Sequence, residues 1–68
     1  MLGENLKAAR LGNGYTQQEL ADKVQEHRVN IAKYESGTGV PSVAVLIRLA
    51  DALNVSLDWL FDREGNGK

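Results

Sequence analysis

Apolar residues recur every three or four positions along most of this chain, and this spacing predicts helices rather than strands. Leu2, Leu6 and Ala9 form the inner stripe of a first helix over about residues 3–11. The tripeptide Gly-Asn-Gly at 12–14 follows, and these residues tolerate the positive φ angles at which helices commonly end. The chain is therefore expected to open with one amphipathic helix.

The C-terminal third of the chain shows the same helical spacing. Ser42 is a good N-cap residue, and the apolar pattern behind it predicts a helix over 43–53. Residues 43–47 alone would also suit a buried strand, but the pattern continues in helical spacing and no other segment could pair with a strand. The apolar positions of this helix are Val43, Leu46, Ile47, Ala50 and Leu53.

Two short helices joined by a tight turn are predicted between residues 16 and 37. Thr16 and Glu19 have the spacing of a capping box, in which each side chain accepts a hydrogen bond from the other residue's amide. Tyr15 and Leu20 flank this cap with the spacing of a hydrophobic staple. The inner face of the first of these helices is Leu20, Ala21 and Val24.

The second of these helices should start near Arg28 and end before Gly37. Ile31 and Tyr34 lie three positions apart and predict its inner face. A short helix that stands out from a compact body can enter the major groove of DNA, which is about 12 Å wide. Its outward face would be Arg28, Val29, Ala32, Lys33 and Ser36.

Several motifs follow one another along the chain in a specific order and without gaps. They are the first helix with Arg10, the QxELA run from Gln17 to Ala21, the KYESG run from Lys33 to Gly37, Pro41-Ser42, and LADALNVSLDWLF from Leu49 to Phe61. Together they resemble the helix-turn-helix domain of the phage Cro/C1 repressor family, also called the XRE type. The resemblance implies an all-α, compact, five-helix fold of the lambda-repressor-like class.

Two residues at the turn between the central helices depart from the family pattern. The family usually has Gly where this chain has Gln25, and a non-Gly residue in the left-handed region costs roughly 1 kcal/mol. The next position is usually apolar, whereas this chain has Glu26. We expect either a turn of another shape or a Glu26 side chain that points into solvent.

The outward face of the second central helix supplies the candidates for base contact. Arg28 suits guanine O6 and N7, worth roughly 1–3 kcal/mol of discrimination, although a phosphate contact or a solvated position would also suit it. Val29 and Ala32 offer methyl groups for a thymine methyl, unless Val29 is core in place of Glu26. Lys33 fits a guanine or a phosphate.

Four polar residues are candidates for contact with the DNA backbone. Gln17 lies in the first turn of its helix, where free amides and the helix dipole favour phosphate, and the resemblance implies this contact. It is otherwise an ordinary helix former. His27, where the family often has a Ser or Thr cap, and Asn30 are expected near phosphates. Thr38 could donate to a second phosphate, although loop flexibility explains its flanking glycines equally well.

The resemblance also implies a partly buried ion pair between Arg10 and Glu35, which would join the first helix to the end of the second central helix. The alternative is two unrelated surface charges. If the pair is buried, loss of one partner should cost several kcal/mol.

A fifth helix, capped by Ser56, is too apolar to be buried entirely by so small a body, and part of it is expected to contact a second copy. Two recognition helices would then lie about 34 Å apart over a near-palindromic site. Residues 1–62 would form this one domain, and 63–68 a flexible tail. The predicted dimer contacts are Leu57, Leu60 and Phe61.

The net charge of −1, from 8 basic and 9 acidic residues, predicts weak nonspecific affinity for DNA. Specific binding stays open, because Asp51, Asp58 and Asp62 lie in the C-terminal third, whereas Arg28 and Lys33 lie in the N-terminal half. The chain has no Cys and one His, so we expect no metal, no cofactor, no small-molecule ligand and no enzymatic activity. No apolar run approaches the ~20 residues of a membrane span.

These observations predict a sequence-specific transcriptional regulator, most simply a repressor, that binds double-stranded DNA through the major groove as a homodimer. It would work in the cytoplasm, at a bacterial or phage nucleoid. The alternative is a protein-interaction module, such as an antitoxin or an anti-repressor partner, which the negative charge and Glu26 favour slightly. Salt dependence separates the two, because phosphate contacts give a steep slope and apolar docking a shallow one.

Overall fold

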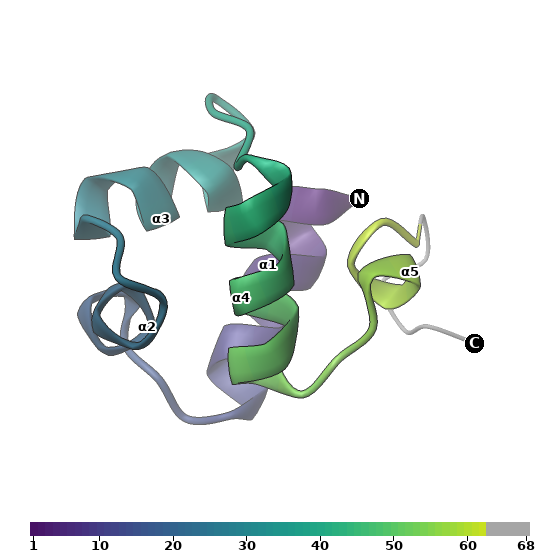
Figure 1. The fold of residues 1–68 in the computed structure, drawn as a ribbon, viewed down its shortest axis with the longest axis horizontal. Helices are drawn as coiled ribbons and strands as arrows, with labels where there is room; N and C mark the ends of the chain where they lie inside the picture. Colours follow the sequence, from purple (N-terminus) through teal and green to yellow (C-terminus); the bar gives the residue numbers. More distant parts are fainter. Residues whose placement is uncertain (63–68) are drawn as a thin grey trace.

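The computed structural model describes residues 1–62, and this part of the chain is built of five α-helices and no strand (Figure 1). The predicted all-α, five-helix fold is therefore confirmed, and each predicted helix is present. The predicted tail at 63–68 lies outside the described residues. Within residues 1–62, no helix is both long enough and apolar enough to span a membrane. The helices are α1 (Leu2–Gly12), α2 (Gln17–Val24), α3 (Arg28–Ser36), α4 (Val43–Leu53) and α5 (Leu57–Leu60).

Side-chain caps begin three of the helices, and each was predicted from the sequence. The capping box of α2 is complete: the Thr16 hydroxyl accepts from the Glu19 amide at 3.0 Å, and the Glu19 carboxylate accepts from the Thr16 amide at 2.8 Å. The Ser42 and Ser56 hydroxyls cap α4 and α5 by accepting from the amides of Val45 and Trp59. These hydroxyls satisfy amides that no helical carbonyl can reach, which explains why the helices begin at these residues.

Helices α2 and α4 end in the same backbone motif. Gln25 and Asn54 follow them with φ angles of 60° and 58°, in the left-handed region. The amide of the next residue then bonds back into the helix, Glu26 to the Ala21 carbonyl at 2.9 Å and Val55 to the Ala50 carbonyl at 3.0 Å. This pattern is the Schellman motif. Gln25 therefore adopts the conformation in which the family usually has glycine, and the expectation of a turn of another shape is wrong.

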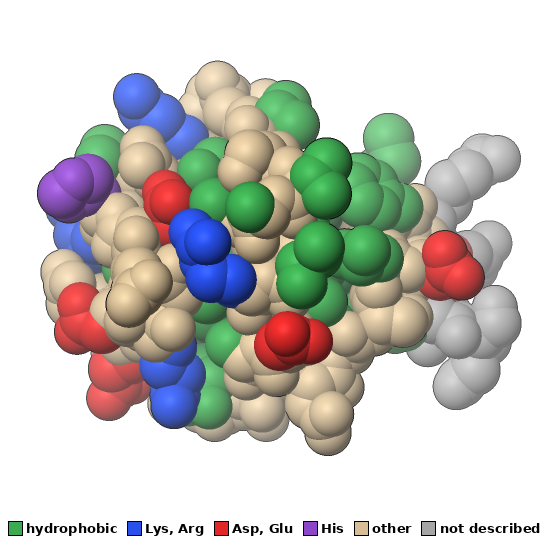
Figure 2. Space-filling model, viewed as in Figure 1, with side chains coloured by type: hydrophobic (Ala, Val, Ile, Leu, Met, Phe, Trp, Pro, Cys, Tyr) green, Lys and Arg blue, Asp and Glu red, His purple; other side chains and the backbone are tan. Residues whose placement is uncertain are grey.

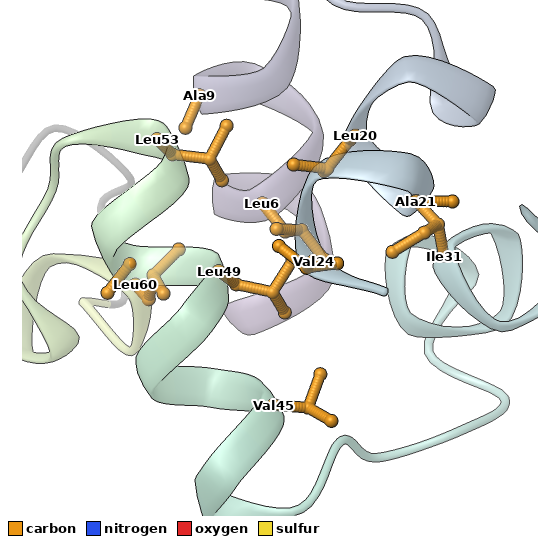
Figure 3. Close-up of a cluster of buried hydrophobic side chains, with 11 residues drawn as sticks. Leu6, Ala9, Leu20, Ala21, Val24, Ile31, Val45, Leu49, Leu53 and Leu60 are labelled. Carbon is orange, nitrogen blue, oxygen red and sulfur yellow. The ribbon is translucent and has the colours of Figure 1, made fainter. Parts of the chain in front are cut away.

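The core lies where α1, α2, α3 and α4 meet, and α5 closes it from the side (Figure 3). α1 and α2 both pack on α3, α2 also packs on α4, and α5 packs on α1 and α4. The predicted inner residues of α1 to α3 are in or against this core. The core residues are Leu6, Ala9, Leu20, Ala21, Val24, Ile31, Val45, Leu49, Ala50, Leu53 and Leu60.

The buried face of α4 differs from the apolar stripe that its sequence suggests. Val43 is 70% exposed and Ile47 is 47% exposed, whereas Val45 and Leu49 are buried. α4 carries apolar residues on more than one side, so helical spacing alone cannot choose between them. The choice is made by α2 and α5, which pack on the side of Leu49.

Asn5 of α1 and Asn13, the residue that follows α1, hold the ends of other helices, and these contacts were not predicted from the sequence. Asn5 is 2% exposed, and its amide donates to the carbonyls of Trp59 and Leu60 at 3.0 and 2.9 Å. Asn13 donates to the carbonyl of Leu53, the last residue of α4, at 3.1 Å. Such side chains satisfy carbonyls that have no partner within their own helix. The available signal was a polar residue, Asn5, beside the apolar stripe of α1.

Candidate nucleic-acid interface

α3 lies along one edge of the molecule, and α5 lies toward the opposite end of the long axis (Figure 1). Arg28, Lys33 and Ser36 are exposed, Ala32 is partly buried, and Ile31 on the opposite side is fully buried. Val29 is 51% exposed, which excludes its alternative role as a core residue in place of Glu26. The predicted outward face of this helix therefore does face outward, with its two cations, Arg28 and Lys33, free of ion pairs within residues 1–62.

The start of α3 lacks the side-chain cap that begins α2. His27 occupies the N-cap position with φ −80° and ψ 145°, its side chain is exposed, and it makes no capping hydrogen bond. The first turn contains no acidic residue. The amide end of α3 therefore carries positive partial charge, with Arg28 as its first residue, and this combination favours an approaching anion such as phosphate.

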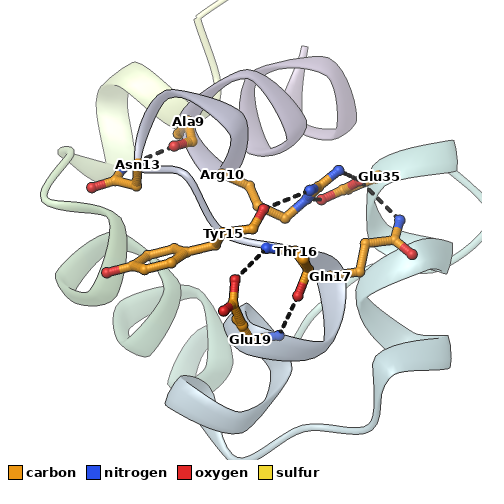
Figure 4. A network of polar contacts seen from close by, with 8 residues as sticks. All are labelled: Ala9, Arg10, Asn13, Tyr15, Thr16, Gln17, Glu19 and Glu35. Atoms are coloured by element: carbon orange, nitrogen blue, oxygen red, sulfur yellow. Dashed lines mark hydrogen bonds and ion pairs between the residues drawn. The ribbon is translucent and has the colours of Figure 1, made fainter.

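The predicted ion pair between Arg10 and Glu35 is present and buried (Figure 4). Arg10 Nε donates to Glu35 Oε2 at 2.6 Å, and Arg10 Nη2 donates to Oε1 at 3.1 Å, so the pair is bidentate. The side chains are 8% and 4% exposed. Arg10 Nη1 also donates to the Tyr15 carbonyl at 2.8 Å. This pair joins α1 to the C-terminal turn of α3 and to the segment before α2.

Gln17 also takes part in this network, a role that was not predicted from the sequence. Its side-chain nitrogen donates to Glu35 Oε1 at 3.1 Å, and the residue is only partly buried (Figure 4). A glutamine amide has two hydrogens, so one remains for a second acceptor. The start of α2 is thereby held against the end of α3, and the phosphate contact of Gln17 stays a prediction.

The Glu26 side chain does not point into solvent, so the second of the two expectations for the turn is also wrong. Its side chain is 16% exposed. Glu26 Oε1 accepts hydrogen bonds from Asn30 Nδ2 at 3.0 Å and from the Tyr34 hydroxyl at 3.2 Å, and Oε2 lies 3.8 Å from Arg48 Nη2. Asn30 and Tyr34 are four positions apart on one side of α3, so both donors can reach one carboxylate.

This arrangement affects the pKa of the Tyr34 hydroxyl. Burial of the phenol raises its pKa above the ordinary value of 10.0, and the negative charge of Glu26 and the hydrogen bond to it raise the pKa further. A tyrosine of ordinary pKa is already protonated at neutral pH, and the raised pKa keeps the Tyr34 hydroxyl able to donate to Glu26 up to a higher pH.

Asn30 and Thr38 have partners that bear on their predicted phosphate contacts. The Asn30 amide is turned toward Glu26 rather than outward, so a DNA contact would use its second hydrogen. Thr38 is exposed, and its hydroxyl lies 3.0 Å from the Ser36 hydroxyl, close to the end of α3. Both contacts remain predictions, and Thr38 is the better placed of the two.

The apolar residues around α5 fall into two groups. Leu60 is fully buried in the core, so its predicted role as a dimer contact is wrong: it faces α1 and α4 and has no surface to offer a partner. Leu57 is 39% exposed and Phe61 52% exposed, and they keep that predicted role. Figure 2 shows apolar side chains gathered on this face, over α4 and toward α5. Val43 and Ile47 of α4 are also exposed apolar residues, but the sequence did not predict them as dimer contacts.

The chain is similar in sequence to known helix-turn-helix transcriptional regulators. The helix-turn-helix family model matches residues 6–60. The chain is 41% identical over its whole length to the uncharacterized HTH-type transcriptional regulator YqaE of Bacillus subtilis, of which it covers 59%. It is 38% identical over 88% of its length to the cryptic phage CTXphi transcriptional repressor RstR of Vibrio cholerae, of which it covers 54%. The chain thus spans little more than half the length of these relatives.

The structure is also similar to that of a DNA-bound protein. The crystal structure of SinR, the master regulator for biofilm formation, in complex with DNA superimposes with a TM-score of 0.85 at 30% identity. The match covers 91% of this chain and 100% of the SinR chain in that crystal.

Proposed function

Because the chain belongs to the helix-turn-helix family of the Cro/C1 (XRE) type, we propose that it binds double-stranded DNA sequence-specifically and regulates transcription, most simply by occupying a promoter as a repressor. The observation that carries the proposal is the outward face of α3, which presents Arg28, Val29 and Lys33 at an edge of the molecule. The similarity to a protein in complex with DNA supports this function.

We assign two kinds of contact to the residues at this face. Arg28 is proposed to bind guanine O6 and N7, while Val29 and Ala32 pack on thymine methyl groups and Lys33 binds a guanine or a phosphate. Contacts to the DNA backbone, which position the protein but do not read sequence, are assigned to Gln17, His27, Asn30 and Thr38.

The protein is proposed to act as a homodimer on a near-palindromic operator, in the cytoplasm at the nucleoid. The exposed apolar residues Leu57 and Phe61 supply the contact, and Val43 and Ile47 extend it. Because α5 lies toward the other end of the molecule from α3, a second copy seated on it would leave both recognition helices uncovered (Figure 1). An interface of this kind buries about 800 Å² on each partner.

Alanine at Arg28 should weaken binding to a selected palindromic duplex by roughly 10- to 100-fold and reduce the preference at one base pair in each half-site. Alanine at Thr38, whose hydroxyl takes no part in the Glu35 and Glu26 contacts, should weaken binding to all duplexes alike, because a phosphate contact carries no sequence information. Affinities for the selected duplex and its single-base variants, measured at one salt concentration, test both. If wild type and Arg28→Ala bound every duplex equally well, the assigned recognition helix would be wrong.

Serine at Phe61 or Leu57 should shift the monomer–dimer equilibrium toward monomer without unfolding the domain, since both side chains are exposed. Leu11→Ser is the matched control, because Leu11 is 57% exposed on α1 and outside the proposed interface. Sedimentation velocity over a concentration series measures the effect. Equal dimerisation of all three variants would rule out this surface as the interface.

A further inference from the structure

α3 has few apolar contacts to hold it in place. Of its 9 residues, all of them described, Ile31 alone has a fully buried apolar side chain, and Tyr34 packs against the core from its margin. A helix with a full apolar stripe resists rotation about its own axis, whereas one buried side chain resists it much less. The rotation of α3 must therefore be held largely by polar contacts on its two flanks.

One of these flanks is held by the buried carboxylate of Glu35, which Arg10 and Gln17 bind from α1 and α2. The other flank is formed by Asn30 and Tyr34, which both donate to Glu26.

The carboxylate of Glu26 is itself tied to the rest of the molecule through Arg48 of α4. Arg48 Nε donates to the carbonyl of Val24, the last residue of α2, at 3.0 Å, and Arg48 Nη2 faces Glu26 Oε2 at 3.8 Å. Glu26 thus connects the end of α2, one flank of α3 and the middle of α4.

The chain contains its own comparison for this position. Val55 follows α4 at the same place in the same backbone motif and packs against the core, as is usual for residues at this position. The motif therefore forms with an apolar residue there and does not require a carboxylate. An apolar contact is also non-directional, whereas a carboxylate that accepts from two donors of α3 restricts the rotation of that helix.

We propose that Glu26 is a positioning residue for DNA recognition: its carboxylate fixes the rotation of α3 and thereby the bases that Arg28, Val29 and Lys33 reach. This inference rests on the proposed function. The radius of a helix with its side chains is about 5–6 Å, so a rotation of about 20° moves a side-chain tip by about 2 Å. A hydrogen bond to a base edge does not survive such a displacement.

Two substitutions at Glu26 test the proposal. Glu26→Gln keeps a carbonyl oxygen that can accept from Asn30 and Tyr34, so its base preferences should match those of wild type. Glu26→Val removes both hydrogen bonds and restores the kind of residue found at Val55. We expect Glu26→Val to stay folded and to change the relative affinities for single-base variants of the selected duplex by about tenfold, the size of one altered base contact.

Tyr34→Phe removes one of the two hydrogen bonds from the other side and keeps the ring in place. It should shift the same base preferences in the same direction by about threefold, and this variant also serves if Glu26→Val does not fold. A purely structural role would lower stability, seen in urea unfolding, and reduce affinity for all duplexes by one factor.

The proposal is overturned if Glu26→Val, or Tyr34→Phe where Glu26→Val does not fold, retains the base preferences of wild type. It is also overturned if Glu26→Gln changes the preferences as much as Glu26→Val. Failure of the proposed function would look different, because wild type itself would then select no duplex from a random pool.

Discussion

Replacement of Arg10 by alanine is expected to leave most of the protein unfolded at 25 °C. The substitution removes both hydrogen bonds to Glu35 and the bond to the Tyr15 carbonyl, and leaves a carboxylate that is 4% exposed with Gln17 as its remaining described donor. An unpaired buried charge costs about 3–5 kcal/mol. A domain of this size has only a few kcal/mol of stability, so this loss is comparable to the whole. Urea unfolding followed by circular dichroism measures it.

Arg48→Ala is the control for the loss of an arginine. The Arg48 side chain is 42% exposed and its distance to Glu26 is 3.8 Å, so we expect a loss of about 1 kcal/mol or less. The double variant Arg10→Ala/Glu35→Ala should be more stable than Arg10→Ala alone, because it leaves no buried charge unpaired. A loss in Arg10→Ala no larger than that in Arg48→Ala would show that the buried pair does not stabilise the fold.

Alanine at Gly3 should lower the free energy of unfolding by about 2 kcal/mol, or the Tm by roughly 10 °C. A Cβ atom at this position would lie 2.5 Å from the carbonyl oxygen of Glu35 and 2.9 Å from that of Tyr34. Both are backbone atoms at the C-terminal end of α3, so relief requires that α1 and α3 move apart. Because that movement also shifts the recognition helix, affinity for the selected duplex should fall as well. Thermal unfolding and duplex titration measure the two effects.

Gly12→Ala is the matched control, because Gly12 belongs to the same helix and a Cβ atom there meets nothing within 4 Å. Alanine favours helix over glycine by up to about 1 kcal/mol at either position, so this control should be neutral or stabilising. The difference between the two variants isolates the close approach of α1 to α3. Equal stability of the two variants would mean that α1 can move away from α3 at Gly3 without lowering the free energy of unfolding.

Helical periodicity predicted the residues of the candidate site that share one face of a single helix. Arg28, Val29 and Lys33 share one face because of their spacing along a helix, and Ile31 falls on the opposite face for the same reason. The pairing of Arg10 with Glu35 came from the family resemblance, since no local rule connects residues 25 positions apart. The hydrogen bonds of Asn30 and Gln17 could not be predicted from the sequence, because their partners, Glu26 and Glu35, lie outside the helix of each residue.

By itself, the sequence determined the number of helices, where the capped helices begin, and the outward face of α3. Those properties depend on residues within one turn of each other, such as Thr16 with Glu19, and so they act before the chain is compact. Only the tertiary structure decided that Leu60 is core while Phe61 is surface, and that Glu26 is bound rather than solvated. Each of these outcomes depends on which neighbouring helix arrives at a given side, and that is a property of the packed arrangement rather than of any local stretch of residues.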